Sequence, residues 1–258
     1  MSQPIAFITG ASSGIGQALA LRYLQAGWRV ALVARRVDAL QAWAQQAGVA
    51  ADRVLALAAD VRDESAITAA GQQCLAQWGL PEVVIANAGI SVGMDTADPA
   101  DLAVMRRTLE TNVLGMAATF SPFVAPMCQR GRGALVGVAS VAGIRGLPGH
   151  GAYCASKAAT ISYLESLRGE CRASGVKVVT LVPGYVDTPL TRRNRYSMPF
   201  LMTPEAFAGR AFQAVQAGDR YRVIPWQMGV VATLMRALPN ALFDRIFAGR
   251  PRKRRQHE

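Results

Sequence analysis

The sequence contains very little lysine and histidine. Among its 28 basic residues only Lys157, Lys177 and Lys253 are lysines, and the two histidines are His150 and His257. Neither these histidines nor the four cysteines stand at the spacing of metal ligands or of a Cys-x-x-Cys redox motif. The sequence therefore predicts no metal site, and a chain of this size needs no disulfide to be stable.

The chain also lacks a secretory signal and a segment able to cross a membrane. The apolar run from Val223 to Met235 is too short to span a bilayer. Without a signal or paired cysteines, the protein is expected in a reduced, cytoplasmic compartment. The net charge of +11 is not accompanied by a helix-turn-helix, finger or aromatic stacking motif, so we expect no nucleic-acid partner.

Nothing in the sequence divides it into domains, since it has no flexible linker and no internal repeat. Short apolar runs alternate with longer amphipathic stretches. The pattern predicts strands at 4–9, 29–34, 53–58, 82–86, 133–138, 176–182 and 221–224, and helices at 15–26, 37–47, 64–78, 100–129, 152–173, 204–217 and 227–248. This alternation predicts one α/β domain over residues 1–258, with a doubly wound parallel sheet of about seven strands and helices on both faces.

The first predicted strand runs directly into a glycine-rich turn, and a helical pattern follows. The turn reads Thr9-Gly10-Ala11-Ser12-Ser13-Gly14-Ile15-Gly16. Glycines allow the backbone to approach a ligand closely, and the unpaired N–H groups of the first helical turn face an anion. The sequence therefore predicts that this turn binds a dinucleotide pyrophosphate, although its spacing differs from the common Gly-x-Gly-x-x-Gly fingerprint.

Polar residues or glycines follow each of the first six predicted strands. In open parallel sheets ligands bind beyond the carboxyl ends of the strands, so these residues are expected to share one site. They are Gly10 to Gly16, Arg35 and Arg36, Asp60 and Val61, Asn87-Ala88-Gly89, Ser140, and Pro183-Gly184.

Tyr153 and Lys157 are four residues apart in a predicted helix, and therefore lie on one helical face. An unperturbed tyrosine has a pKa of about 10, and a fixed positive charge nearby is expected to lower it by roughly 1–3 units. This would bring the phenol into the range of general acid–base catalysis. Ser140, on an upstream loop, is placed to hold a substrate oxygen by a hydrogen bond.

Together these motifs resemble the short-chain dehydrogenase/reductase superfamily over about residues 5–190. The resemblance implies a Rossmann fold, a nicotinamide cofactor, and a catalytic tetrad of Asn112, Ser140, Tyr153 and Lys157. In such enzymes Tyr153 would be the acid, and Lys157 would bind the nicotinamide ribose and lower the tyrosine pKa. Asn112 would hold a water that links Lys157 to bulk solvent.

The resemblance also implies a set of residues along the cofactor. Asp60 would hydrogen-bond the adenine, Asn87 and Gly89 would lie along the cofactor, and Thr188 would contact the carboxamide. The full implied set is Gly10, Ser12, Ser13, Gly14, Ile15, Gly16, Arg35, Arg36, Asp60, Val61, Asn87, Ala88, Gly89, Tyr153, Lys157, Pro183, Gly184, Val186 and Thr188.

The end of the second predicted strand favours NADP(H) over NAD(H). In dinucleotide folds an acid there hydrogen-bonds the ribose 2′-hydroxyl, whereas arginine accommodates a 2′-phosphate. Ala34 stands where NAD-dependent relatives carry aspartate, and Arg35 and Arg36 follow it. Two guanidinium groups can chelate a phosphate, although Arg36 could also face solvent.

Beyond Thr188 the resemblance ends. Residues 189–203 correspond to the lid over the substrate in such enzymes. They mix Arg192, Arg193 and Arg195 with apolar and aromatic side chains. This composition favours an apolar substrate with an anionic group, unless the arginines face solvent.

The C-terminal part lacks the glycine-rich ending of oxoacyl-carrier-protein reductases. Residues 226–248 form an amphipathic helical segment instead, and a basic tail at 249–258 is expected to be solvated and disordered. One alternative is that the segment packs on the domain or on a second copy of the chain, which would give a homodimer or larger homo-oligomer. The other is that residues 226–258 contact the inner face of a membrane peripherally or close a substrate entrance. The apolar stripe is Val231, Leu234, Met235, Leu238, Leu242 and Ile246.

The sequence thus predicts an enzyme, an NADP(H)-dependent oxidoreductase that interconverts a ketone and a secondary alcohol. A hydrophobic or lipid-like substrate is expected, with a sugar, polyol or polysaccharide precursor as the alternative. A non-catalytic NADP-binding sensor is an alternative of a different class, but such proteins typically lose the tyrosine or the lysine, and this chain keeps both.

Overall fold

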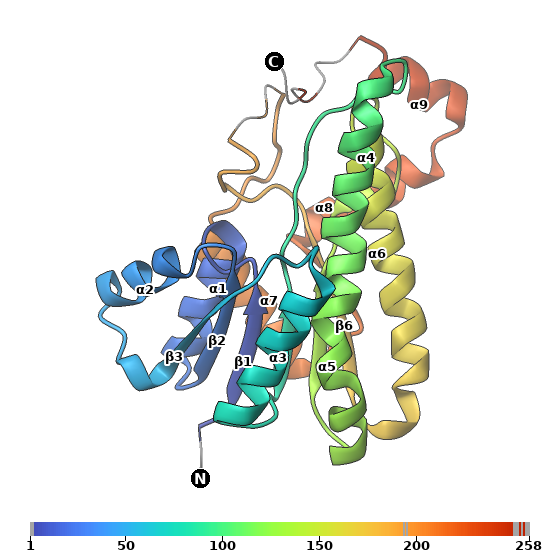
Figure 1. The fold of residues 1–258 in the computed structure, drawn as a ribbon. Helices are drawn as coiled ribbons and strands as arrows, with labels where there is room; N and C mark the ends of the chain where they lie inside the picture. Colours follow the sequence, from blue (N-terminus) through green and yellow to red (C-terminus); the bar gives the residue numbers. More distant parts are fainter. Residues whose placement is uncertain (1–2, 193, 195, 250–252, 254, 256–258) are drawn as a thin grey trace.

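The computed structural model describes residues 3–192, 194, 196–249, 253 and 255. Its centre is a seven-stranded parallel sheet in the order β3-β2-β1-β4-β5-β6-β7. Figure 1 shows β3, β2 and β1 side by side in that order. The strands are β1 (Ile5–Thr9), β2 (Arg29–Ala34), β3 (Val54–Ala58), β4 (Val83–Ala86), β5 (Ala134–Val138), β6 (Lys177–Pro183) and β7 (Tyr221–Ile224). The chain order reverses between β1 and β4, and that switch point opens a crevice at the carboxyl ends of the strands.

Helices cover both faces of the sheet, as predicted. One hydrophobic core joins α1, α2 and α7 to one face, and a second joins α3, α5 and α6 to the other. The helices are α1 (Gly14–Gln25), α2 (Val37–Gln46), α3 (Glu64–Trp78), α4 (Leu102–Leu109), α5 (Gly115–Arg130), α6 (Gly151–Glu170), α7 (Pro204–Ala217), α8 (Trp226–Ala237) and α9 (Asn240–Phe247). The doubly wound α/β fold predicted from the sequence is therefore confirmed.

Local chemistry explains where several elements begin. Every residue of β1 is buried, which fits a central strand covered on both faces. The Asp63 carboxylate accepts a hydrogen bond from Ala66 N at 2.9 Å and caps α3. Thr203 caps α7 in the same way, and Pro204 occupies the first position of that helix.

The predicted helix over 100–129 is interrupted. A π-helical turn, Glu110–Leu114, separates α4 from α5. Within it, Asn112 is fully buried and its side chain bonds to the backbone of Ile90. Single π turns inside helices are common at functional sites, and this one holds a residue of the implied tetrad.

The predicted helix over 227–248 is also two helices, because Pro239 has no N–H to continue the hydrogen-bond ladder. Not all of the apolar stripe packs on the domain, since Leu234 is 63% exposed and Leu242 is 47% exposed. Met228 and Ala232 are buried instead and anchor α8. Among the described residues, no helix has both the length and the apolar character that crossing a membrane requires.

The basic tail is not fully solvated, contrary to expectation. Lys253 is only 7% exposed, and Arg255 forms ion pairs with Asp98 and Asp101. Buried charges are stable only when hydrogen-bonded or paired, and both side chains meet that condition. The remaining basic residues of the tail, Arg250, Arg252 and Arg254, lie outside the described part of the chain.

Candidate active site

A cavity of about 520 Å³ opens at the carboxyl ends of the strands, at the switch point between β1 and β4. All but three of the site residues expected from the sequence line it. The exceptions are Gly16, Arg36 and Asn112. The cavity extends from Arg35, after β2, to Tyr153 on α6, so one site joins motifs that are more than a hundred residues apart.

The glycine-rich turn packs too closely against the protein's own backbone for side chains at Gly10 and Gly16. A Cβ atom on Gly10 would lie 2.7 Å from Ala88 Cα, and one on Gly16 would lie 2.2 Å from the Gly10 carbonyl oxygen. The first turn of α1 carries no acidic residue, and its Ser13 cap makes no side-chain hydrogen bond. Backbone amides at a helix N-terminus without a competing acid suit a pyrophosphate. These residues therefore fit a dinucleotide.

Side chains from β1 and the end of β4 fix the shape of this turn. The Thr9 hydroxyl accepts hydrogen bonds from Asn87 N at 3.2 Å and Ala88 N at 3.3 Å. The Asn87 amide nitrogen donates to the carbonyl oxygens of Thr9 and Gly10 at 3.0 and 3.2 Å. Asn87 thus has a structural role in addition to its place along the cavity wall.

Two arginines and one aspartate line the end of the cavity near β2 and β3. Arg35 lines it, whereas the exposed Arg36 does not and instead stands at the N-cap position of α2. Arg62, which the sequence analysis overlooked, also lines the cavity and forms an ion pair with Asp60 at 2.7 Å. Its hydrogen bonds hold the pKa of the Asp60 carboxyl below its usual range. In the sequence, Arg62 could have been recognised by its position two residues after Asp60, which follows the third predicted strand.

The Asp60 carboxylate is already bonded within the protein. Both carboxylate oxygens accept from the Arg62 guanidinium, and one also accepts from the Arg62 backbone N–H. Because the acid is engaged in this way, it orients Arg62 within the cavity wall. A hydrogen bond from Asp60 to an adenine would have to share these oxygens.

Ser140 and Tyr153 meet at the other end of the cavity. Ser140 follows β5 directly and is 7% exposed, and its Oγ accepts from Ala142 N at 3.2 Å. Burial raises the pKa of the Tyr153 phenol, and a hydrogen bond with Ser140 offsets this in part. The expectation of a phenol pKa below its usual value is therefore not met, because burial outweighs the lowering by Ser140. The phenol stays protonated at neutral pH, which is the form that can donate a proton.

Lys157 lies one helical turn after Tyr153 and is only 4% exposed. Its Nζ donates to the Val138 carbonyl oxygen at 2.7 Å and lies 5.8 Å from the centroid of the Tyr153 ring. Burial lowers the pKa of this ammonium to about 8. The charge is therefore present at neutral pH but is lost at moderately alkaline pH.

Asn112 lies behind the cavity wall and connects three segments. Its Oδ1 accepts from Ile90 N at 2.8 Å, and its Nδ2 donates to the Ile90 carbonyl oxygen at 3.0 Å and to Ser156 Oγ at 2.9 Å. Gly89 stands between Asn112 and Lys157, because a Cβ there would lie 3.3 Å from Asn112 Oδ1 and 3.6 Å from Lys157 Nζ. The glycine keeps open the space between these two tetrad residues.

Aromatic side chains lie beside the chemical end of the cavity. His150 Nε2 and the Tyr196 hydroxyl are 3.2 Å apart, and the ring of Tyr185 is 6.3 Å from that of Tyr196. Tyr196 is also close enough to Tyr153 for the two to interact electrostatically. Neither His150 nor Tyr196 was expected to take part in the site, because no motif marks them.

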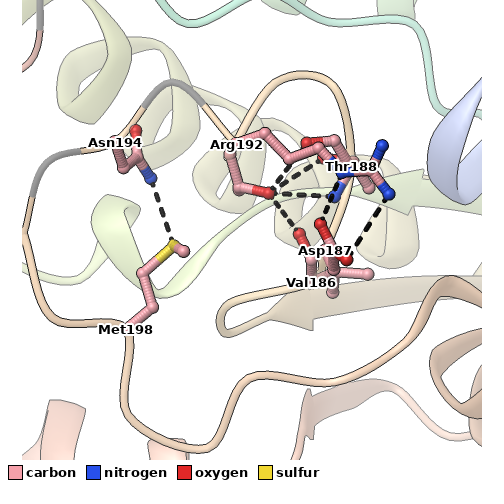
Figure 2. A network of polar contacts seen from close by, with 7 residues as sticks. Val186, Asp187, Thr188, Arg192, Asn194 and Met198 are labelled. Atoms are coloured by element: carbon pink, nitrogen blue, oxygen red, sulfur yellow. Dashed lines mark hydrogen bonds and ion pairs between the residues drawn. The ribbon is translucent and has the colours of Figure 1, made fainter.

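Arg192, the one lid arginine among the described residues, is bonded to an aspartate. Figure 2 shows Arg192 against Asp187, with Arg192 Nε and Asp187 Oδ1 2.8 Å apart. In the same segment the Asn194 amide lies 3.5 Å from Met198 Sδ. Arg193 and Arg195 lie outside the described residues. The arginine that can be placed is therefore an exposed ion-pair partner.

Comparisons with known proteins identify the family. The family model for short chain dehydrogenases matches residues 4–198. An uncharacterized oxidoreductase of Myxococcus xanthus (strain DK1622) is 40% identical over 244 residues, covering 95% of this chain and 96% of that protein.

Solved structures are similar as well. A short-chain dehydrogenase from Streptomyces avermitilis has a TM-score of 0.81 at 27% identity and covers 90% of this chain and 92% of its own. A short-chain dehydrogenase from Sphingobium yanoikuyae, in complex with NADPH, has a TM-score of 0.75 at 26% identity. The match covers 92% of this chain and 97% of that chain. The chain therefore belongs to the short-chain dehydrogenases, oxidoreductases that act on alcohol and carbonyl groups with a nicotinamide dinucleotide.

Proposed function

We propose that this protein is an NADP(H)-dependent oxidoreductase that interconverts a ketone and a secondary alcohol on a hydrophobic or lipid-like substrate. One observation carries the proposal: Ser140, Tyr153 and Lys157 converge at one end of a cavity whose other end holds Arg35. A proton donor and a phosphate-binding cation thus share one continuous site. A non-catalytic sensor would not need a proton donor.

The residues divide the chemistry between them. NADPH, when bound, supplies the hydride that adds to the carbonyl carbon. Ser140 holds the carbonyl oxygen by a hydrogen bond, and Tyr153 transfers its phenolic proton to that oxygen as the C–O double bond becomes a single bond. Lys157 holds the cofactor ribose and supplies positive charge beside the phenol. In the oxidation direction the same proton returns to Tyr153.

The lining of the cavity near Tyr153 supports an apolar substrate. Ile90, Val92 and Leu190 contribute apolar side chains to the wall, and Tyr185 and Tyr196 add aromatic surface beside it. A pocket with mostly apolar walls and a few placed polar groups favours an apolar ligand with one polar function. A sugar or polyol would present several hydroxyl groups to these apolar side chains.

A consumption assay for NADPH tests this proposal. Ketones of increasing apolar size, aldehydes and sugars are offered at equal concentration, and initial rates are compared. Bulky apolar ketones should give the highest kcat/KM, because apolar burial contributes about 0.8 kcal/mol for each CH₂ group. Faster turnover of sugars would overturn the substrate class. No consumption with any carbonyl compound would overturn the activity.

The lowered pKa of Lys157 gives a prediction that needs no substrate. The ammonium should lose its proton near pH 8, because burial disfavours the charged form. With only three lysines in the chain, NMR of lysine labelled with ¹³C at Cε should show three signals, and a Lys157→Met variant assigns one of them. That signal should titrate near pH 8. If the chemical shift of the Lys157 signal changed only above pH 10, the pKa of this ammonium would not be lowered and the prediction would be wrong.

We also propose that the protein forms a homo-oligomer through α8. Trp226, Val230 and Leu234 follow one another at helical spacing and are 67%, 50% and 63% exposed. Helices that lie on membranes carry lysines and arginines on their polar face, whereas α8 carries Arg236 alone. A second copy of the chain is therefore a better partner for this strip than a lipid surface.

Light scattering after size-exclusion chromatography tests the oligomer. Leu234→Glu should lower the molar mass, because it places a charge in the apolar strip. Arg236→Glu is the matched control, since it also places a carboxylate on α8, at an exposed position on another side of the helix. A wild-type protein of monomer mass that sedimented with phosphatidylserine vesicles at low salt would contradict the proposal and favour membrane contact.

A further inference from the structure

The C-terminal tail returns to the loop between β4 and α4. The Arg255 guanidinium donates through Nε to Asp101 Oδ2 at 2.8 Å, and its Nη2 forms an ion pair with Asp98. Asp101 is 1% exposed and also accepts from Asp95 N at 2.7 Å. Truncating one partner of a buried charge pair is costly, so Arg255 and the loop are strongly coupled.

Lys253, two residues earlier, connects this loop to the opposite wall of the cavity. Its Nζ donates to Ser91 Oγ at 2.9 Å and to the Leu190 carbonyl oxygen at 3.4 Å. Ser91 stands between two cavity-lining residues of the β4–α4 loop, and Leu190 lines the cavity from the segment after β6. One side chain therefore spans the two walls.

The bridge lies next to the residues beside Tyr153. Lys253 is close enough to His150 to affect its ionisation, and His150 contacts Tyr196, which in turn interacts with Tyr153. The tail therefore meets the cavity at the end where proton transfer takes place.

We propose that Lys253 and Arg255 supply the outer wall of the substrate cleft, with Arg255 as the positioning residue that fixes the tail and Lys253 as the residue that joins the two sides of the entrance. The tail then limits which substrates reach Tyr153, and it has to move aside when a substrate enters the cleft. This inference rests on the proposed function only in taking the cavity beside Tyr153 as the place where substrate binds.

Hydrogen exchange of the full-length protein tests the bridge without any substrate. Arg255→Gln should speed amide exchange roughly tenfold or more in both segments that the tail joins, because charge-assisted hydrogen bonds are lost. These segments are residues 90–101 and 185–192. Lys177→Gln, which removes one positive charge from the amino end of β6, is the control and should leave both unchanged. Equal NADPH binding by all variants checks their fold.

A second readout uses the small number of histidines. Burial lowers the pKa of His150, and the charge of Lys253 lowers it further. His150 and His257 are the only histidines, so His257→Gln assigns their NMR signals. Lys253→Gln and Arg255→Gln should both raise the pKa of His150, the second because the whole tail leaves its place.

The outcomes are distinct. Unchanged exchange in Arg255→Gln would overturn the proposal, as would faster exchange in residues 90–101 alone, since the tail would then touch only one wall. A His150 titration that responds to Lys253→Gln but not to Arg255→Gln would remove the positioning role of Arg255. Failure of the carbonyl reductase assay would leave all these measurements unaffected, so the two proposals fail separately.

Discussion

Replacing Tyr153 with phenylalanine is expected to lower kcat by about 10²–10⁴-fold, the usual contribution of a general acid. The Kd for NADPH should stay nearly the same, because the hydroxyl contacts Ser140 and is needed only for proton transfer. Steady-state rates measure kcat, and a fluorescence titration with NADPH measures the Kd. Lys157→Ala should differ by weakening cofactor binding as well.

The matched control for this variant is Tyr163→Phe. Tyr163 belongs to the same helix, α6, but packs against the core on the α3 and α5 side of the sheet, away from the cavity. Its loss of a hydroxyl should leave kcat close to that of the wild type. If Tyr153→Phe kept more than about a tenth of the wild-type kcat, another group would have to be the acid.

Replacing Arg35 with aspartate should reverse the cofactor preference. The wild-type protein is expected to bind NADPH at least about tenfold more tightly than NADH, since a charge-assisted hydrogen bond contributes about 1.5–3 kcal/mol. In the variant the carboxylate would repel a 2′-phosphate and accept a hydrogen bond from a ribose 2′-hydroxyl. Fluorescence titrations with both cofactors measure the change.

Arg36→Asp is the control that the structure provides. It makes the same change of charge one residue away, at a position that does not line the cavity. Its effect on the ratio of the two Kd values should be small. A reversal in Arg36→Asp and not in Arg35→Asp would reassign the phosphate contact, and equal affinities of the wild type for both cofactors would refute it.

The sequence predicted well those features that depend on neighbouring residues. The strands are short apolar runs, and turn glycines and polar residues follow them directly. Because the carboxyl ends of parallel strands meet at one edge, strand order alone brings Gly10, Asn87 and Ser140 together. Correct strand positions therefore sufficed to place most of the candidate site.

Features that depend on contacts across the chain were not predictable in this way. The π turn forms where Asn112 bonds to Ile90, and no periodicity reports that bond. The pKa of Tyr153 depends on burial, which helical spacing to Lys157 does not reveal. Arg255 docks because Asp101 is buried more than 150 residues earlier in the chain. From the sequence alone, a terminal run of basic residues is expected to be solvated, because a buried acidic partner such as Asp101 cannot be recognised there.

The burial of two lysines has a practical consequence for coupling chemistry. Lys157 and Lys253 are 4% and 7% exposed, while Lys177 is exposed. Amine-reactive esters should therefore modify Lys177 first among the lysine side chains. Lys177 begins β6, and the amino ends of parallel strands lie opposite the edge that carries the cavity. Attachment to a solid support through this single amine would leave the entrance of the cleft facing solution.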